Sequence, residues 1–554
     1  MNTYLKLKKS NCKNCYKCIR NCPVKSIKFA DGQANIISDE CILCGQCLVV
    51  CPQNAKEIRS DAYKAKEFIK NGEKVVVSIA PAFAANFKGA SISNIETALK
   101  KLGFYSVEET ALGATVVKKK YDEMIIKGEQ DVIISSCCPT VNTLIQKYYP
   151  EALKYLAKVL TPMQTHGKMI KEKEPEAKVV FIGPCVSKKY EGDSADSYID
   201  CVLTFEELAE WLEEENVKIE VSAEQAQGGK AAFFPTVGGI LKSMDCDKSY
   251  EYITVDGIDN CISIIKDVLQ NKLTKCFIEI SACKGSCVGG PAKLTENHSS
   301  IIDTIAVNKY AGDVDYDVKN TEVDTEYAFI GTNRVMPGEA KINEILLEMG
   351  KRNKSDELNC GACGYNTCRE KAIAVYFGKA ELTMCLPFLT EKAESFSDTI
   401  IKNTPNAIIV LNEDLLIQQI NSAAMKVFGI KYTSEIVGEQ VIRILDPKPF
   451  LDVLDSGKAR MEEKVYLARY DRYVEQTVLY DRHYHIVICL MRDVTDEENA
   501  RIKKEKLSHD TIDVTDRVVE KQMRVVQEIA SLLGETAAET KIALTKLKDS
   551  LKDE

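Results

Sequence analysis

The chain has 554 residues, far more than a single hydrophobic core accommodates, so several domains are expected. Hydrophobic residues make up 45% and charged residues 28%, and the formal net charge of −9 comes without a basic block, which argues against a nucleic-acid partner. No apolar run approaches the ~20 residues of a membrane span, and the N-terminus lacks the apolar stretch of a secretory signal. A cytoplasmic protein that does not enter a membrane is therefore expected.

The chain contains 22 cysteines, and most of them are clustered. In a reducing compartment, clustered thiols are typical of metal ligands rather than disulfides. A few cysteines fall outside the clusters and are expected to be small, buried apolar side chains. These are Cys201, Cys246, Cys261, Cys276 and Cys489.

Two cysteine runs with the spacing C-x2-C-x2-C-x3-C-P occupy residues 12–23 and 41–52. This is the ferredoxin run, in which the fourth cysteine binds the other four-iron–four-sulfur cluster, or cubane. A zinc ribbon, the alternative, would use two cysteine pairs without the paired prolines. The first cubane is expected on Cys12, Cys15, Cys18 and Cys51, and the second on Cys41, Cys44, Cys47 and Cys22.

The sequence after residue 60 alternates between strand-like and helical segments. Apolar runs at 75–79, 131–134 and 177–182 are each followed by Pro, Cys or Gly and then by helical sequence such as 94–102. That alternation predicts α/β units with their chemistry at the strand ends.

Three cysteine-containing segments in this region lie far apart in sequence, at residues 135–139, 183–191 and 279–290. Two directly follow the strand-like runs, and the third follows the apolar run 276–280. Converging strand ends would bring four thiolates together around one metal cluster.

In this order, the three segments resemble the three signature loops of the FeFe-hydrogenases, over roughly residues 70–345. The segments 80–82 and 235–239 support the resemblance. It implies an H-cluster, which is a cubane joined to a two-iron subsite that carries carbonyl, cyanide and an amine-bearing dithiolate. The implied cubane ligands are Cys138, Cys185, Cys283 and Cys287, with Cys287 bridging to the subsite.

The resemblance also implies roles for the side chains around the subsite. Lys188 would donate a hydrogen bond to a cyanide, and Cys137 would pass protons to the bridging amine. Pro81 and Ala82 would line the subsite.

The chain departs from the catalytic members of the family beside the subsite. Those members usually have Met at the positions of Gly183 and Ser281, and Gly-Trp where this chain has Thr140-Val141. The departures resemble the sensory branch of the family and predict slow turnover.

The outer proton relay of the family also differs. It uses two glutamates and a serine, and the positions that align with them hold Lys120, Met124 and Ala157. These differences suggest that the outer part of the proton route is lost. The alternative is that an unrecognised relay replaces it, with Glu123 and Glu191 as candidates.

A further cysteine group begins at residue 359 with N-C-G-A-C-G-Y-N-T-C. Its spacing, C-x2-C-x4-C-x16-C, predicts a small domain with a third accessory cubane, with zinc as the alternative. The expected ligands are Cys360, Cys363, Cys368 and Cys385. A site between the hydrogenase-like part and the tail suggests an electron exit toward the tail.

The tail begins with a segment that resembles a PAS sensor domain, a β-sheet with short helices that ends in Asp493-Val494-Thr495. His483, His485 and Cys489 fall on one face of a strand by period two. A haem ligand among them is conceivable, and a solvated or hydrogen-bonded histidine is the alternative.

The last fifty or so residues show sustained apolar heptads, which predict a coiled coil and a homodimer rather than a helix packed on its own PAS domain. His509 on this helix is interpreted as an ordinary surface residue. The heptad positions, apolar except for Thr540, are Val519, Met523, Val526, Ala530, Leu533, Ala537, Thr540, Leu544, Leu547 and Leu551.

Together these features predict a multidomain α/β and α+β protein. Its expected parts are a dicluster ferredoxin domain (1–60), an α/β H-cluster domain (61–345), a small 4Fe-4S domain (346–392), a PAS domain (393–497) and a coiled-coil helix (498–554). The leading hypothesis is a sensory FeFe-hydrogenase that turns over H2 slowly, passes electrons through its cubanes and signals through the tail. Expected partners are H2, a ferredoxin-like or other redox protein, and an effector such as a phosphatase or kinase.

Two alternatives stay open from the sequence. One is a metabolic ferredoxin-linked hydrogenase, and the other is a non-catalytic hydrogenase-like iron–sulfur protein of the assembly-factor type.

Overall fold

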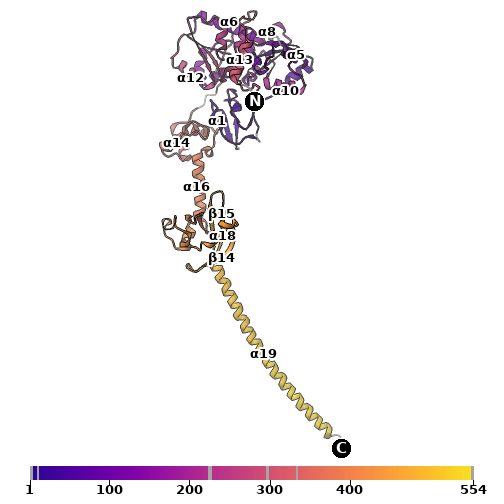
Figure 1. Ribbon diagram of the computed structural model, residues 1–554, viewed down its shortest axis with the longest axis vertical. Helices are drawn as coiled ribbons and strands as arrows, with labels where there is room; N and C mark the ends of the chain where they lie inside the picture. Colours follow the sequence, from indigo (N-terminus) through magenta and orange to yellow (C-terminus); the bar gives the residue numbers. More distant parts are fainter. Residues whose placement is uncertain are drawn as a thin grey trace. The chain divides into compact units, whose positions relative to one another are not determined.

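The computed structural model describes residues 4–8, 11–30, 32–221, 227–294, 299–331 and 335–550. The chain divides into two compact units, Met1–Leu389 and Thr390–Glu554, and Figure 1 shows the elements of each. In the described part of the chain, no helix combines the length and apolar character needed to cross a membrane.

The N-terminal part of the first unit is built from two small antiparallel sheets. Strand β1 (Leu5–Leu7) pairs with β4 (Lys56–Ile58), and β2 (Ile27–Ala30) pairs with β3 (Gln33–Ile36). The short helices α1 (Lys17–Arg20) and α2 (Gln46–Val49) each begin inside one of the two cysteine runs. The equal spacing of the two runs is thus reflected in equal local structure.

The larger part of the first unit holds two parallel sheets. One has the strand order β6-β5-β8-β9, and the other has the order β10-β11-β7. Parallel strands are covered on both faces, which explains why the apolar runs predicted as strands do not alternate with polar residues. The strands are β5 (Val75–Ile79), β6 (Ser106–Glu109), β7 (Val132–Ile134), β8 (Lys178–Gly183), β9 (Cys201–Thr204), β10 (Glu251–Asp256) and β11 (Cys276–Ser281).

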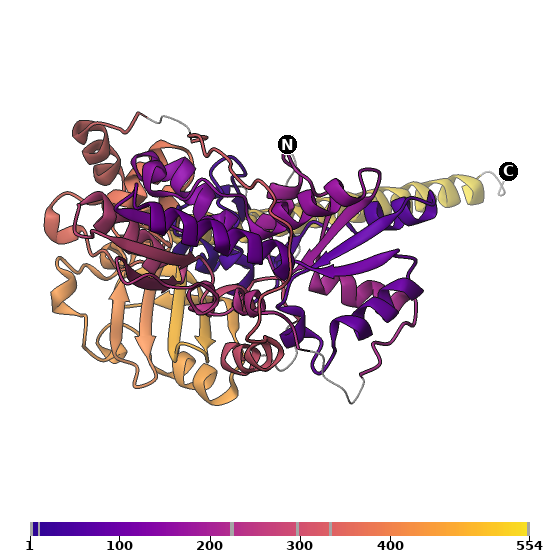
Figure 2. The same cartoon turned by 90° about the horizontal axis from the view of Figure 1, so that it is seen from above.

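Helices connect these strands in the α/β manner predicted from the sequence, and Figure 2 shows the violet strands of the larger sheet among them. The helices are α3 (Ala62–Lys70), α4 (Phe83–Asn86), α5 (Ile92–Lys101), α6 (Ala111–Lys127), α7 (Pro139–Tyr148), α8 (Pro162–Lys173), α9 (Ser187–Gly192), α10 (Phe205–Glu214), α11 (Gly239–Ser243), α12 (Ile258–Leu269) and α13 (Ser300–Tyr310). Short 3-10 turns are η2 (Pro150–Tyr155), η3 (Lys230–Phe233) and η4 (Ser286–Gly289).

The last part of the first unit carries the further cysteine group. Helix α14 (Glu339–Glu348) packs on α15 (Cys368–Tyr376), with the turns η5 (Lys354–Asp356) and η6 (Leu382–Met384) beside them. Helix α16 (Leu386–Asn403) then leads into the second unit.

The second unit contains a five-stranded antiparallel sheet with the order β13-β12-β16-β15-β14. Strand β12 alternates between buried and half-buried residues, as expected for a sheet with one face in the core. The elements are β12 (Ala407–Asn412), β13 (Ile417–Ile420), α17 (Ser422–Phe428), η7 (Thr433–Glu435), η8 (Val441–Arg443), α18 (Lys448–Ser456), β14 (Arg460–Leu467), β15 (Arg472–Asp481) and β16 (Ile486–Asp493). The expected α+β architecture of this region is confirmed.

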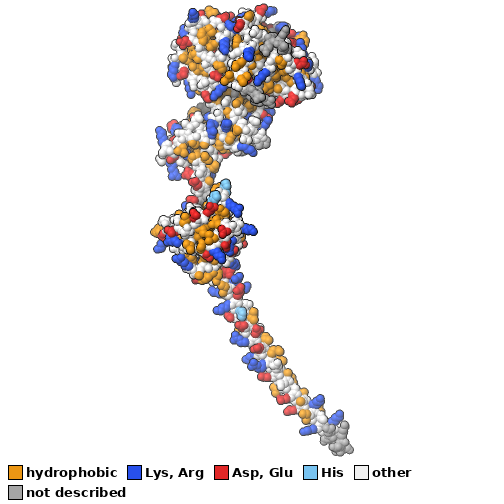
Figure 3. Space-filling model, viewed as in Figure 1, with side chains coloured by type: hydrophobic (Ala, Val, Ile, Leu, Met, Phe, Trp, Pro, Cys, Tyr) orange, Lys and Arg blue, Asp and Glu red, His pale blue; other side chains and the backbone are white. Residues whose placement is uncertain are grey.

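The predicted C-terminal helix is also present, as α19 (Thr495–Ser550). Every described side chain from residue 499 to 546 is exposed, and Figure 3 shows hydrophobic side chains along the helix among charged ones. The two final heptad positions, Leu547 and Leu551, lie outside the described side chains. Coiling with a second helix stays a prediction.

Candidate metal centre

The three cysteine segments of the first unit meet at one cavity of about 110 Å³. Each segment follows the carboxyl end of a parallel strand, namely β7, β8 or β11, and these strands come from both sheets. The cavity is lined by the thiols of Cys138, Cys185, Cys283 and Cys287. Apart from these, its lining is mainly apolar: Ala80, Pro81, Ala82, Ala114, Pro139, Pro162, Met163, Phe181, Pro184, Phe234, Pro235 and Ala282.

Local backbone preferences bring the cysteine segments together. Cys138 is the extended N-cap residue of α7, and Pro139 occupies the first helical turn, where a missing N–H costs nothing. The segment after β11 packs directly on the segment after β8, because a Cβ at Gly290 would lie 2.5 Å from the carbonyl oxygen of Pro184. Glycine is therefore required at this contact.

The donor set fits an iron–sulfur cluster. Four sulfurs in an apolar cavity are the soft ligands that such clusters use. Burial raises the pKa of Cys138, Cys283 and Cys287 above the ordinary thiol value, so these groups stay protonated when no iron is bound. Cluster binding would then be coupled to release of their protons.

Cys137 lines the same cavity and is held by Tyr121 of α6. Its Sγ lies 3.2 Å from the Tyr121 hydroxyl oxygen. Burial raises the pKa of Cys137 to about 12, against the opposing effects of the Tyr121 hydrogen bond and of Lys188. A neutral thiol at this position is able to give or take a hydrogen bond.

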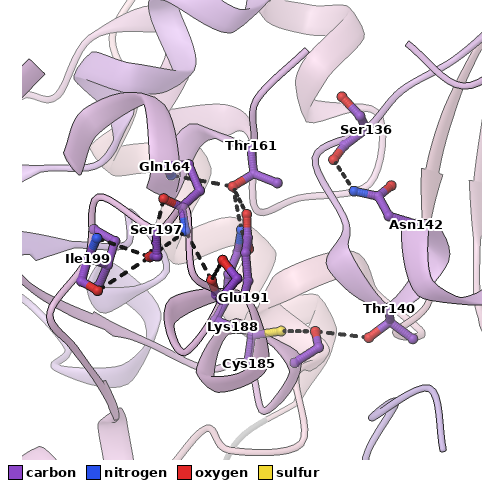
Figure 4. A network of polar contacts seen from close by, with 12 residues as sticks. Ser136, Thr140, Asn142, Thr161, Gln164, Cys185, Lys188, Glu191, Ser197 and Ile199 are labelled. Atoms are coloured by element: carbon purple, nitrogen blue, oxygen red, sulfur yellow. Dashed lines mark hydrogen bonds and ion pairs between the residues drawn. The ribbon is translucent and has the colours of Figure 1, made fainter. Parts of the chain in front are cut away.

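Lys188 also lines the cavity, and two hydrogen bonds hold its ammonium in place (Figure 4). Its Nζ donates to Thr161 Oγ1 at 2.9 Å and to Glu191 Oε2 at 2.7 Å. Thr161 is the N-cap of α8 and also donates to Glu191 Oε1 at 2.5 Å. The Lys188 and Glu191 side chains are only 10% and 15% exposed, so the pair is largely shielded from water.

A second short network lies beside Cys185. The Cys185 Sγ is 3.1 Å from the Ser187 hydroxyl, which accepts a hydrogen bond from Thr140 at 3.0 Å. Thr140 directly follows the first cysteine segment and Ser187 belongs to the second, so this hydrogen bond joins the two segments.

The structure brings most of the predicted subsite residues together. Pro81, Ala82 and Ser281 line the cavity, whereas Gly183 is not part of the lining described. A Cβ at Gly183 would lie 2.8 Å from ring atoms of Phe181, and Phe181 itself lines the cavity. The aromatic ring thus occupies the space that a side chain at Gly183 would need.

The positions aligned with the outer relay offer no path from the cavity. Lys120 pairs with Asp324 at 2.9 Å, Ala157 is fully buried, and Met124 packs in an apolar cluster. Glu123, one of the suggested substitutes, is exposed on α6.

Sequence reasoning did not identify Tyr121 or Thr161 as part of this site. Tyr121 lies on α6 between Lys120 and Met124, the two positions there that align with the outer relay, and its own position was assigned no role. Thr161 followed by Pro162 is a helix N-cap pattern, which indicates a helix start and nothing about a lysine partner.

The N-terminal cysteine runs lie against the cavity domain. A Cβ at Gly45 would lie 2.5 Å from Pro291, so the loop of the second run packs on the segment after η4. Cys44 and Cys283 are close enough to interact electrostatically. The cubane expected on the second run would therefore adjoin the cavity.

The Cys360–Cys385 group also packs on the N-terminal part. Arg20 Nε donates to the Gly361 carbonyl at 3.2 Å, and Lys25 Nζ donates to the Gly364 carbonyl at 3.1 Å. Cys22 and Cys363 belong to one apolar cluster. The cysteine groups are thus neighbours within the first unit.

The remaining cysteine and histidine predictions have mixed outcomes. Cys201, Cys261, Cys276 and Cys489 are buried as expected, whereas Cys246 is exposed, so the prediction for Cys246 was wrong. Cys246 follows α11 in a polar loop in which residues 245–249 are all exposed.

The strand interpretation of the PAS histidines is corrected. His483 lies in the turn between β15 and β16, and His485 is exposed with Nδ1 2.9 Å from Glu413. Cys489 is buried and accepts a hydrogen bond from Gln476 Nε2 at 3.3 Å. The three side chains do not form one site.

The comparisons with known proteins match this architecture part by part. Residues 73–291 match the family described as iron only hydrogenase large subunit, C-terminal domain. Residues 4–68 match a 4Fe-4S dicluster domain, residues 356–387 an FeS cluster domain, and residues 395–494 the PAS fold.

Similar proteins include both hydrogenases and assembly factors. The chain is 26% identical to iron hydrogenase 1 of Clostridium pasteurianum, over 43% of this chain and 53% of that protein. It is 24% identical to the cytosolic Fe-S cluster assembly factor NAR1 of Yarrowia lipolytica, over 33% of this chain and 45% of that protein. The chain therefore spans about half the length of these curated relatives.

A solved structure of an apo FeFe-hydrogenase HydA1 variant from Chlamydomonas reinhardtii is also similar. It is 17% identical, covers 50% of this chain and 100% of that chain, and has a TM-score of 0.40.

The fold and the cysteine groups define a multidomain iron–sulfur protein with a PAS domain. Its central part is similar to the C-terminal domain of the iron-only hydrogenase large subunit. The domain matches indicate four-iron–four-sulfur clusters together with an H-cluster.

Proposed function

We propose that this protein is a sensory FeFe-hydrogenase, which binds and slowly turns over H2 and signals through its PAS domain and α19. The observation that carries the proposal is the meeting of Cys137 and Lys188 with four cluster thiols in one apolar cavity. A cubane alone would need only the thiols. The Cys137 thiol and the Lys188 ammonium are additional groups in the cavity, and both are suited to contacts with a two-iron subsite.

When bound, the H-cluster would supply the iron centre at which H2 is split heterolytically. Cys138, Cys185, Cys283 and Cys287 would hold it. Lys188 would offer its ammonium as a hydrogen-bond donor to an anionic ligand, with Thr161 and Glu191 fixing the orientation of the side chain. Cys137 would hold or release the transferred proton at Sγ. The apolar lining would exclude water, which strengthens these interactions.

Slow turnover is proposed because the chain lacks the outer relay of catalytic relatives. Lys120, Met124 and Ala157 have no titratable group that faces the cavity. General acid–base catalysis by a positioned group typically contributes ~10²–10⁴-fold. A low rate suits a sensor, whose output depends on the state of the site rather than on flux.

The signalling part of the proposal rests on α19. Exposed apolar side chains such as Val519, Met523, Val526 and Leu533 recur at heptad spacing, and exposing such a seam to water is unfavourable. A second copy of the chain would cover it as a parallel or antiparallel coil. Redox changes at the Cys360–Cys385 group would then bias the PAS–coil packing and act on an effector protein, such as a phosphatase or kinase, in a reducing cytoplasm.

The similarity to assembly factors supports a second candidate, a non-catalytic iron–sulfur protein. Cys137 and Lys188 are the residues that distinguish the two candidates, because neither has a task without a two-iron subsite. A metabolic ferredoxin-linked hydrogenase is distinguished from the sensor by its turnover with a low-potential ferredoxin.

The test of the signalling proposal compares matured protein under hydrogen and under argon. Amide hydrogen exchange along residues 498–554 is expected to differ between the two gases. Exchange that is the same under both gases, in a sample whose cluster responds to hydrogen, would contradict a signalling role for α19.

A further inference from the structure

Positive charge is concentrated at the N-terminal end of the chain. Residues 1–30 contain eight lysine and arginine residues and no aspartate or glutamate, although the whole chain has a formal net charge of −9. These basic residues are interspersed with the cysteines of the first run. The second run, residues 41–52, has the same cysteine spacing and no charged residue. Cluster binding by such a run therefore does not account for the positive charge.

The basic residues of the first cysteine run lie at the surface. Lys13 and Lys17 flank Cys15 in sequence, and all three side chains are exposed. Among the ion pairs of the described residues, Lys8 pairs with Glu57 at 3.5 Å, whereas Lys13 and Lys17 take part in none. The charges of Lys13 and Lys17 are therefore available to a partner.

A partly apolar, uncharged area adjoins these lysines. Helices α1 and α2 are in contact, and Val49 at the end of α2 is 60% exposed. Residues 52–54, which follow Cys51, are exposed and uncharged. Protein–protein interfaces combine an apolar centre with a polar rim in the same way. We call this area the first-cubane surface, and it consists of Lys13, Cys15, Lys17, Arg20 and Val49.

We propose that the first-cubane surface is the docking site for a small acidic protein that carries single electrons at low potential. Opposite charges steer such a partner to the surface and raise the association rate by ~10–10³-fold. The cubane expected on Cys12, Cys15, Cys18 and Cys51 would lie at this surface, so electrons would have a short path between partner and cluster. This inference rests on the proposed function, since the electrons are those of H2 turnover.

The Cys360–Cys385 group is the competing docking site, because Cys360 is also exposed. The residues around it carry both signs of charge, with four basic and three acidic residues between 351 and 370. One of the basic residues, Arg369, is paired with Glu339. A surface of mixed charge attracts an acidic partner less strongly than a surface of one sign. The first-cubane surface is therefore the better match.

The test uses the full-length protein reconstituted with iron and sulfide, without a two-iron subsite. The probe is an acidic flavodoxin in its anionic hydroquinone state. The flavin hydroquinone gives one electron to a cubane and becomes the neutral semiquinone, and no proton is transferred. Stopped-flow absorbance of the semiquinone gives the second-order rate constant. This readout does not require hydrogen turnover.

Lys13→Glu combined with Lys17→Glu is expected to lower the rate constant about tenfold at ~0.01 M salt, where charges act over ~30 Å. Near ~1 M salt, where their reach is ~3 Å, the difference from wild type is expected to vanish. Arg352→Glu combined with Lys354→Glu is the matched control, because it makes the same change of charge at exposed positions near Cys360. This control is expected to keep the wild-type rate constant. Iron content and reduction by a small dye show that the cubanes of each variant are intact.

Equal rate constants for wild type and for the Lys13→Glu, Lys17→Glu variant at low salt would overturn the inference. A slow control would also overturn it, because the docking site would then lie at the Cys360–Cys385 group. A wild-type rate constant that does not fall with added salt would contradict electrostatic docking without any variant. Wild-type protein that binds duplex DNA and does not react with flavodoxin would assign the surface to nucleic acid instead.

The failure of this inference and the failure of the proposed function give different results. Matured protein without carbonyl and cyanide bands would contradict the proposed function. The flavodoxin measurement would still decide where an acidic electron carrier docks, because it requires only the cubanes.

Discussion

The cavity domain of the first unit and helix α19 of the second unit differ in whether their apolar side chains are covered by the same chain. The cavity domain gathers three distant segments and covers their apolar side chains with its own helices, so its residues contact one another within one chain. Along α19, every described side chain from residue 499 to 546 is exposed, although the sequence carries a regular apolar seam. One region is complete within a single chain, whereas the other requires a second surface. Chemistry is therefore expected from the single chain and signalling from the assembled one.

The largest effect is expected when a cluster ligand is removed from the cavity, because this tests whether the single chain binds the cluster there. Reconstituted without maturation, the wild-type protein is expected to bind about sixteen irons, or four cubanes by the ligand count. Cys283→Ser, reconstituted in the same way, is expected to bind about twelve irons, and after maturation it is expected to show no hydrogen turnover, unlike matured wild-type protein. Iron analysis and a turnover assay measure both.

The control is Cys276→Ser, which changes a buried thiol outside the cysteine groups. It is expected to keep all its iron. An unchanged iron content in Cys283→Ser, or zinc bound at the Cys360–Cys385 group, would contradict the ligand assignment.

A smaller effect is expected when the cluster is retained and the proton group is removed. Cys137→Ala is expected to keep its iron and its carbonyl and cyanide bands, while turnover falls by ~10²–10⁴-fold. Turnover with a reduced low-potential donor and an infrared spectrum measure the two properties. Wild-type turnover in a loaded Cys137→Ala protein would show that protons enter elsewhere.

A still smaller effect is expected when the hydrogen bonds that hold the Lys188 side chain are weakened. Thr161→Val removes the hydroxyl that contacts both Lys188 and Glu191. Hydrogen bonds to charged groups contribute ~1.5–3 kcal/mol, so turnover is expected to fall about ten- to hundredfold, with a shift of the cyanide bands. Thr165→Val, on the same helix, is the control, because the Thr165 hydroxyl has no hydrogen-bond partner in the described structure. Equal effects of the two substitutions would indicate a packing defect in α8 instead.

The smallest effect concerns association through α19. Leu533→Asn places an amide in the apolar seam and is expected to weaken dimerisation about tenfold, since burying a Leu side chain contributes ~1.5–3 kcal/mol. Ser531→Asn, an exposed position off the seam, is expected to leave dimerisation unchanged. Light scattering over a concentration series measures both, and a full-length monomer would remove the basis for the coiled coil.

The sequence predicts those parts of the fold that depend on local spacing. Cysteine runs must hold their ligands at short intervals, and buried parallel strands read as continuous apolar runs, as at 75–79 and 177–182. The spacing of the PAS strands likewise reflects one buried face. These features need no knowledge of distant contacts.

Contacts between distant segments were not predictable in the same way. Tyr121 reaches Cys137 because α6 packs beside β7, and Thr161 reaches Lys188 because the start of α8 lies beside α9. Phe181 fills the space next to Gly183, which no spacing rule indicates. The turn between β15 and β16 removed His483 and His485 from the strand face that their period-two spacing suggested. The domain boundaries at residues 60, 345, 392 and 497 stay predictions.

The central claim is that the cavity holds a hydrogen-responsive H-cluster, and infrared spectroscopy of the matured, full-length protein tests it most directly. The account predicts bands of bound carbonyl and cyanide that shift when hydrogen replaces argon. A protein that carries its full complement of cubanes after maturation, yet shows no such bands, would contradict the account and favour a non-catalytic iron–sulfur protein.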